Sequence, residues 1–251
     1  MQRHRFYAPK NQISGNSISL SGEEAHHLSR VLRLDPSREV SVLDGEGDDY
    51  LCRIVSIASH DVQLEIIQVQ PTTSESPIHV TLAQGLVKGD KFDFIVQKAT
   101  ELGVSTITPL ETDHSDVKVK DDRMQKKLER WRRISLESLK QCGRSRLVEI
   151  NEVATVREVA GSTSDCVLLA FTERGGITIS EVLSNQSSTS RIVALVGPEG
   201  GWSEQELALF TDTGCVPVTL GPRILRTETA AVVALTLIQH RLGDLSRSPD
   251  D

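Results

Sequence analysis

Leu195-Val-Gly-Pro-Glu-Gly-Gly-Trp-Ser-Glu204 and Leu220-Gly-Pro-Arg-Ile-Leu-Arg-Thr-Glu-Thr-Ala230 are the two stretches that decide the fold of this chain. Each follows a short apolar run, and each leads into a helical pattern. Glycines after a buried strand permit positive φ angles and let a ligand approach the backbone closely. Two such loops at the ends of strands in one sheet can form a single cleft between them.

The first of these loops differs from the known phosphate loops. Ser203 and Glu206 form a capping-box pattern, which predicts a helix start and therefore a possible anion site. The loop lacks Gly-x-x-x-x-Gly-Lys-Ser/Thr, however, and the chain contains no Gly-x-Gly-x-x-Gly. It carries Glu199, whose carboxylate would repel a phosphate but tolerate a neutral ribose or a cation such as a sulfonium. The alternative is a plain glycine turn with a surface glutamate.

The second loop begins with a Gly-Pro pair, which ends the preceding strand. Thr227 or Thr229 can cap the helix that follows. That helix is apolar nearly all round, so it is buried or lies in an interface. Arg223, Arg226 and Glu228 stand at its start, where charges are costly unless they are paired or used. A structural ion pair between Arg226 and Glu228 is the alternative to a functional role.

The rest of the chain indicates two domains. Of its 251 residues, 38% are hydrophobic and 25% charged, which is typical of a folded globular protein. Strand patterns at 40–43, 50–57 and 62–67 and a helix near 22–33 precede a polar, proline-bounded linker at 71–77. After the linker, apolar strands at 78–83, 104–110, 166–171, 192–196 and 216–220 alternate with helices at 91–102, 124–142, 203–213 and 227–242. This alternation predicts a parallel sheet covered on both faces.

Charge and cysteine usage narrow the functional classes. The net charge is −7, yet nine Lys or Arg and only two Glu lie between Arg123 and Arg146. This basic run fits either a polyanion partner or a solvated helix face. The four cysteines are isolated, which favours a reducing cytoplasm over disulfides or a metal site. No apolar run is long enough to cross a bilayer, and the N-terminus does not resemble a signal peptide.

Taken together, the motifs resemble a known family. The two loops resemble the signature loops of the SPOUT superfamily of S-adenosylmethionine (SAM) methyltransferases. More closely, the chain is similar to the family that methylates N3 of a uridine in bacterial 16S ribosomal RNA. The likeness extends to Glu24-Ala-His-His-Leu-Ser-Arg-Val-Leu-Arg33, Lys88-Gly-Asp-Lys91, Gln97-Lys-Ala-Thr-Glu-Leu-Gly-Val104 and Gln141-Cys-Gly-Arg144.

This resemblance implies an α/β fold with two domains and a short tail. Residues 1–72 would form a small PUA-like RNA-binding β-barrel, and residues 77–243 a SPOUT domain with a trefoil knot on a parallel sheet. Residues 244–251 would be a frayed tail. The implied enzyme is a cytoplasmic homodimer that methylates a specific uridine in the decoding region of 16S rRNA, within the 30S subunit. It would use SAM, with no metal and no membrane partner.

The resemblance also implies the site residues. The cofactor contacts would be Leu195, Gly197, Pro198, Gly200, Gly201, Leu220, Gly221, Leu225, Thr227, Thr229 and Ala230, with Phe171 and Thr172 as weaker candidates. As a hypothesis, Arg226 stabilises the developing uracil anion or grips a phosphate, Glu228 orients Arg226, and Glu199 handles a proton. The loops contain no histidine, and they leave the proton acceptor open.

RNA contacts would come from Arg3, Arg5, His27, Arg30, Arg33, Lys88 and Lys91. Arg30 and Arg33 are three residues apart, which places them on one face of the predicted helix. Two other functions remain open. One is a ribose 2′-O-methyltransferase, since related knotted enzymes share the cofactor loops. The other is a non-catalytic RNA-binding protein that assists ribosome assembly.

Overall fold

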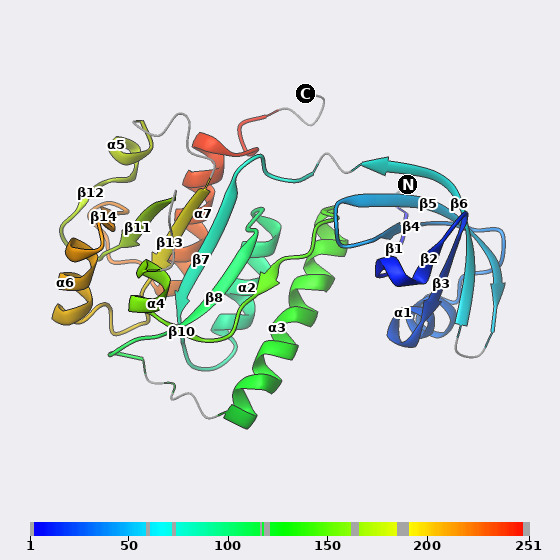
Figure 1. The fold of residues 1–251 in the computed structure, drawn as a ribbon, viewed down its shortest axis with the longest axis horizontal. Helices are drawn as coiled ribbons and strands as arrows, with labels where there is room; N and C mark the ends of the chain where they lie inside the picture. Colours follow the sequence, from blue (N-terminus) through cyan, green and yellow to red (C-terminus); the bar gives the residue numbers. More distant parts are fainter. Residues whose placement is uncertain are drawn as a thin grey trace. The chain divides into compact units, whose positions relative to one another are not determined.

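The chain folds into two compact units in the computed structural model (Figure 1). One unit consists of Met1–Glu75 and Leu139–Leu147, and the other of Ser76–Ser138 and Val148–Asp251. The first unit therefore includes a segment that a linear division at residues 72–77 leaves out. The structure describes residues 3–58, 61–71, 74–115, 117, 121–161, 166–184 and 191–247, so the last four residues of the predicted tail lie outside it.

The first unit is built on a curled sheet of six strands in the order β1-β4-β5-β6-β3-β2 (Figure 1). β1 runs parallel to β4, and the other neighbours are antiparallel. The strands are β1 (Arg5–Tyr7), β2 (Ile13–Ser14), β3 (Ser17–Ser21), β4 (Glu39–Leu43), β5 (Asp48–Ile57) and β6 (Asp61–Pro71). The helical segments are a 3-10 turn (Lys10–Gln12), α1 (Gly22–His26) and a π-helical turn (His27–Val31).

Period-two alternation gives this sheet one apolar face. In β3 and β5, for example, Ile18, Leu20, Cys52 and Ile54 are buried together. Ala25 and Leu28 of the helical segment pack against the same cluster. A half-buried antiparallel sheet of this kind has an inner core face and an outer polar face.

The second unit contains an eight-stranded sheet in which every pair is parallel. The path is β10-β8-β7-β13-β11-β14-β12, with β9 beside β8. The strands are β7 (His79–Gly85), β8 (Thr106–Glu111), β9 (Glu149–Ile150), β10 (Ala154–Thr155), β11 (Val167–Phe171), β12 (Ile177–Thr178), β13 (Arg191–Val196) and β14 (Val216–Thr219). The helices are α2 (Lys91–Glu101), α3 (Asp121–Cys142), α4 (Val156–Gly161), α5 (Ile179–Ser184), α6 (Glu204–Asp212) and α7 (Thr227–Leu242).

Helices cover both faces of this sheet, so its strands are apolar on both sides. In β13, Ile192 and Ala194 join the cluster that contains residues of α2, α3, α5 and α7. Val193 and Leu195 join the opposite cluster, with residues of α4 and α6. The long strands and the four long helices predicted from the alternating pattern are confirmed. The trefoil knot stays a prediction, and no helix in the described ranges is long and apolar enough to cross a membrane.

Candidate functional site

The two glycine-rich loops lie at one edge of the parallel sheet. β11 pairs with β13 on one side and with β14 on the other. Because all three strands are parallel, the loops that follow Phe171, Val196 and Thr219 leave the sheet at the same edge. These loops enclose a cavity of about 710 Å³, within the usual range for a small-molecule site.

Most of the predicted cofactor residues line this cavity. They are Gly197, Pro198, Gly200, Gly201, Leu220, Gly221, Leu225, Thr227 and Ala230, together with Phe171 and Thr172. Leu195 and Thr229 do not line it: the Leu195 side chain is buried in the core and Thr229 is exposed. Residues outside the predicted cofactor set also line it, namely Glu173, Arg174, Val196, Trp202, Leu207, Arg223 and Ile224.

Buried hydrogen bonds hold the two loops together. The Thr227 hydroxyl donates to the Gly197 carbonyl at 2.6 Å and accepts from the Gln84 amide at 2.9 Å. Gln84 lies in β7 and is fully buried. The prediction that Thr227 or Thr229 caps α7 is wrong, because Arg226 occupies the cap position and no side chain caps the helix. The Thr227 hydroxyl instead joins the start of α7 to the first glycine loop.

The loop after β8 supports the first glycine loop from another side. His114 Nδ1 lies 3.0 Å from the Gly200 carbonyl, so the imidazole donates to it. A Cβ atom at Gly200 would lie 2.8 Å from the Cβ of His114, so only glycine fits there. The predicted capping box of Ser203 and Glu206 is confirmed, and Ser203 also donates to Asp113 at 2.5 Å. No sequence signal connected residues 113–114 with this loop.

The charged candidates of the loops differ in their surroundings. Glu199 lines the cavity and forms an ion pair with Lys91, which lines it too. Lys91, predicted to contact RNA, is therefore part of the cavity rim. Arg226 is exposed and lines the cavity, and no ion pair joins it to Glu228 in this structure. Glu228 is half-buried, and its Oε2 is buried without a hydrogen-bond partner. Glu228 therefore does not orient Arg226 here.

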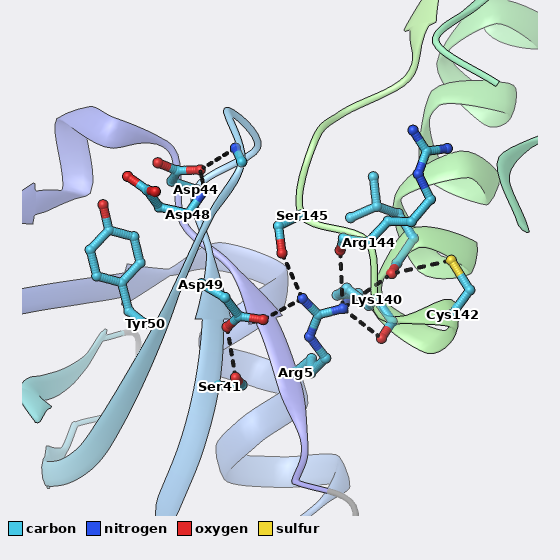
Figure 2. A network of polar contacts seen from close by, with 12 residues as sticks. Arg5, Ser41, Asp44, Asp48, Asp49, Tyr50, Lys140, Cys142, Arg144 and Ser145 are labelled. Carbon is cyan, nitrogen blue, oxygen red and sulfur yellow. Dashed lines mark hydrogen bonds and ion pairs between the residues drawn. The ribbon is translucent and has the colours of Figure 1, made fainter. Parts of the chain in front are cut away.

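Arg5 is not available to RNA, contrary to the prediction. Its side chain is only 10% exposed and binds Asp49 at 2.5 Å and Ser145 at 2.9 Å. It also donates to the carbonyls of Lys140 and Arg144 (Figure 2) and to the carbonyl of Leu139. The guanidinium therefore holds the 139–147 segment within the first unit.

The other predicted RNA-binding residues of the first unit have different surroundings. Arg3 is exposed and pairs with Glu39, and His27 is half-buried against the Phe6 ring. Arg30 and Arg33 are exposed but do not share a helix face. The helix ends at Val31, and Arg33 has a φ of 50° while its Nε donates to the Arg30 carbonyl. Because the backbone at Arg33 is left-handed, the helix does not continue to this residue, and the prediction that Arg30 and Arg33 share a helix face is wrong.

Several residues of the basic run between Arg123 and Arg146 form ion pairs within the protein. Arg130 pairs with Asp93, Lys140 with Glu24, and Arg144 with Glu75. The side chains of Lys140 and Arg144 are only 6% and 5% exposed. Arg123, Lys126, Arg133 and Arg146 are exposed, as is Lys88 at the start of the second unit. Part of the run therefore forms internal contacts, and a polyanion partner for its exposed residues stays a prediction.

The cavity suits a nucleoside that carries a positive charge. Its wall combines apolar side chains, such as Phe171, Leu220 and Ala230, with the main chain of glycines. Such a wall accepts an adenine ring without phosphate anchors. Glu173 and Glu199 at the cavity suit a sulfonium, because a carboxylate favours a nearby positive charge. In the part of the chain that is described, no cluster of His, Cys, Asp or Glu could hold a metal ion.

Comparisons with known proteins agree with this architecture. Residues 74–239 match the family model "RNA methyltransferase domain", and residues 20–67 match "RNA methyltransferase PUA domain". Ribosomal RNA small subunit methyltransferase E of Bacillus subtilis is 34% identical over 96% of this chain and 97% of its own length.

Two solved structures extend the similarity to three dimensions. A methyltransferase from Legionella pneumophila with bound SAM has a TM-score of 0.90 at 31% identity, over 98% of this chain and 100% of its own. A ribosomal RNA small subunit methyltransferase E from Neisseria gonorrhoeae, bound to SAM, has a TM-score of 0.89 at 33% identity, over 97% and 100%.

These matches define the class of the protein as an RNA methyltransferase with a PUA domain. Within that class, the chain belongs to the ribosomal RNA small subunit methyltransferase E family.

Proposed function

We propose that this enzyme transfers a methyl group from SAM to N3 of a uridine in the decoding region of 16S rRNA, within the 30S subunit. The observation that carries the proposal is the cavity between the loops after β11, β13 and β14, which is lined by glycines, apolar side chains and six charged side chains. Methyltransferases with SAM bound share this fold over nearly the whole chain. Relatives named for the small-subunit ribosomal RNA support the choice of substrate.

SAM, when bound, supplies an electrophilic methyl group on a sulfonium. The residues that would hold it are the predicted set that lines the cavity, from Gly197, Gly200 and Gly201 to Leu225, Thr227 and Ala230. Thr227 keeps the two loops at a fixed separation through its bond to Gly197. Catalysis would therefore depend first on positioning. Two reactants that are held in the right geometry no longer lose translational and rotational entropy when they react.

Arg226 is the proposed electrostatic catalyst. N3 of uracil must lose its proton at or before methyl transfer, so negative charge develops on the base. Arg226 is exposed at the cavity and has no ion-pair partner in the described residues, so its charge is available to that anion. A fixed positive group at the site of developing charge is a common source of rate enhancement.

Glu199 is the proposed group for proton handling, because it lines the cavity and Glu228 does not. Glu199 would act together with Lys91, its ion-pair partner at the cavity. Glu228 has a buried carboxylate oxygen without a donor, and an unpaired buried oxygen is costly. A donor from outside this chain, such as the substrate or a second copy, would satisfy it. Glu199 and water are therefore the candidate proton acceptors.

We further propose a homodimer in which α7 lies at the interface, with residues 1–72 as the RNA-binding domain and 77–243 as the catalytic domain. Val232, Val233 and Leu237 of α7 are only half-buried in the single chain, which supports an apolar contact there. Light scattering should give twice the mass of the chain. A monomer at micromolar concentration would contradict the dimer without affecting the proposed chemistry.

The decisive experiment is mass analysis of 16S rRNA nucleosides from a strain that lacks the gene. We expect N3-methyluridine to disappear and to return with the wild-type gene. Loss of a 2′-O-methylated nucleoside instead would favour the ribose methyltransferase. An unchanged set of nucleosides would favour the non-catalytic assembly protein.

A further inference from the structure

Two arginines outside the predicted site face the cavity from different loops. Arg174 lies in the loop after β11, and Arg223 lies in the loop after β14. Both line the cavity and both are exposed. Neither makes a hydrogen bond or an ion pair with any residue that the structure describes.

Glycines with positive φ angles lie close to both arginines in the chain. Gly175 and Gly176 follow Arg174 with φ of 77° and 85°, and Gly221 precedes Arg223 with φ of 102°. Both arginine side chains line the cavity and are exposed, so a ligand can reach them. Both arginines therefore stand at the mouth of the cavity rather than in its buried floor.

More positively charged than negatively charged side chains line the cavity. Arg174, Arg223, Arg226 and Lys91 line it, against Glu173 and Glu199. Lys91 and Glu199 neutralise each other. The three remaining guanidiniums outnumber Glu173 and the one carboxylate of the cofactor taken together, so an additional anionic ligand is expected at this mouth.

We propose that Arg174 and Arg223 bind backbone phosphates of the RNA next to the target nucleotide. This inference rests on the proposed function. An enzyme that modifies a base must take the base out of its stack, which leaves the flanking phosphates at the mouth of the pocket. Guanidinium groups suit phosphate oxygens because they donate two parallel hydrogen bonds. Positions on two separate loops allow each arginine to take a different phosphate.

The test is the salt dependence of RNA binding by Arg174→Ala and Arg223→Ala. The matched control is Arg157→Ala, since Arg157 is exposed on α4 in the same unit and does not line the cavity. Binding to unmodified 16S rRNA is measured between about 50 and 200 mM salt. Each phosphate contact contributes about 0.7 to 0.9 to the slope of log K against log salt.

We expect each of the two variants to lower the magnitude of that slope by about 0.7 to 0.9. At low salt we expect each to bind RNA about three- to tenfold more weakly, with the control unchanged. Arg174→Lys and Arg223→Lys should restore the slope, because the charge is kept. SAM affinity, measured by calorimetry, should stay within about twofold of wild type, which also shows that the pocket is folded.

Two results would overturn the inference. One is a slope equal to that of wild type in both alanine variants. The other is a loss of SAM affinity of about tenfold or more with the slope unchanged, which would assign the arginines to the cofactor carboxylate. A failure of the proposed function is distinguishable: the strain without the gene would then keep its N3-methyluridine, while the slopes measured on purified RNA would still report the phosphate contacts.

Discussion

Two arginines with different predicted roles, Arg5 as an RNA contact and Arg226 as a catalytic residue, have opposite surroundings in the two units. Arg5 of the first unit is enclosed by Asp49, Ser145 and three carbonyl groups (Figure 2). Arg226 of the second unit is exposed beside the cavity, with no ion-pair partner among the described residues. Both were expected to act on RNA or its base.

The difference teaches that the availability of a charge depends on the acceptors that the fold supplies. The acceptors of Arg5 come from residues up to 140 positions away in the chain. A guanidinium surrounded in this way stabilises structure, whereas one at a cavity without acceptors can serve a ligand. Substitutions in the two regions should therefore have different readouts: stability in the first and catalysis in the second.

The largest effect is expected for Arg5→Ala. Removal of the guanidinium leaves the Asp49 carboxylate and several carbonyls without their donor. We expect a loss of about 3 to 5 kcal/mol in the free energy of unfolding, measured by urea denaturation. Arg3→Ala is the control, since its exposed pair with Glu39 should contribute less than about 1 kcal/mol. Equal losses for the two variants would contradict the structural role of Arg5.

Arg226→Ala should lower turnover and leave stability unchanged. A single positive group that stabilises a developing anion contributes a factor of about 10² to 10³ to kcat. SAM affinity should change by less than about twofold, because the contribution is made in the transition state. Single-turnover methylation of 16S rRNA and calorimetry measure the two quantities. A parallel loss of both would mean that Arg226 merely supports the pocket.

Thr227→Val should destabilise the second unit, by less than Arg5→Ala destabilises the first. The substitution keeps the size of the side chain but removes its bonds to Gly197 and Gln84. Buried groups left without partners cost about 1 to 3 kcal/mol, so stability and SAM affinity should both fall. Thr229→Val is the control because Thr229 is exposed and does not line the cavity. If Thr227→Val binds SAM as wild type does, the bond between the loops is unimportant for the pocket.

Two buried cysteines, one in each unit, allow the comparison to be refined. Burial raises the pKa of Cys52 and of Cys215 to about 12, so neither forms a reactive thiolate near pH 8 in the folded protein. Labelling with a thiol reagent, followed by mass spectrometry, therefore reports opening of each unit. Arg5→Ala should accelerate labelling of Cys52 far more than that of Cys215. Equal acceleration would mean that the two units open together.

The sequence alone predicted the features that depend on a regular pattern or on neighbouring residues. Alternating apolar strands and helices predicted the parallel sheet, and Ser203 with Glu206 predicted the start of α6. Glycine content and the charge of Glu199 indicated the kind of ligand. These features depend on neighbouring residues only, which is why pattern alone identifies them.

Contacts between distant segments could not be predicted. The Thr227 hydroxyl reaches Gly197 30 residues away, although its position favoured a helix cap. His114 lies 86 residues from Gly200, and nothing in its surroundings marks it. Arg33 has a left-handed backbone that helical spacing cannot reveal. In each case the tertiary fold brings in a partner that no local rule contains.

The central claim is that the cavity between the loops after β11, β13 and β14 is the methyl-donor pocket. The most direct measurement is a crystal structure of the protein grown with SAM. The account predicts SAM in that cavity, in contact with the main chain at Gly197, Gly200 and Leu225. SAM bound elsewhere, or a cavity without SAM at saturating concentration, would contradict it.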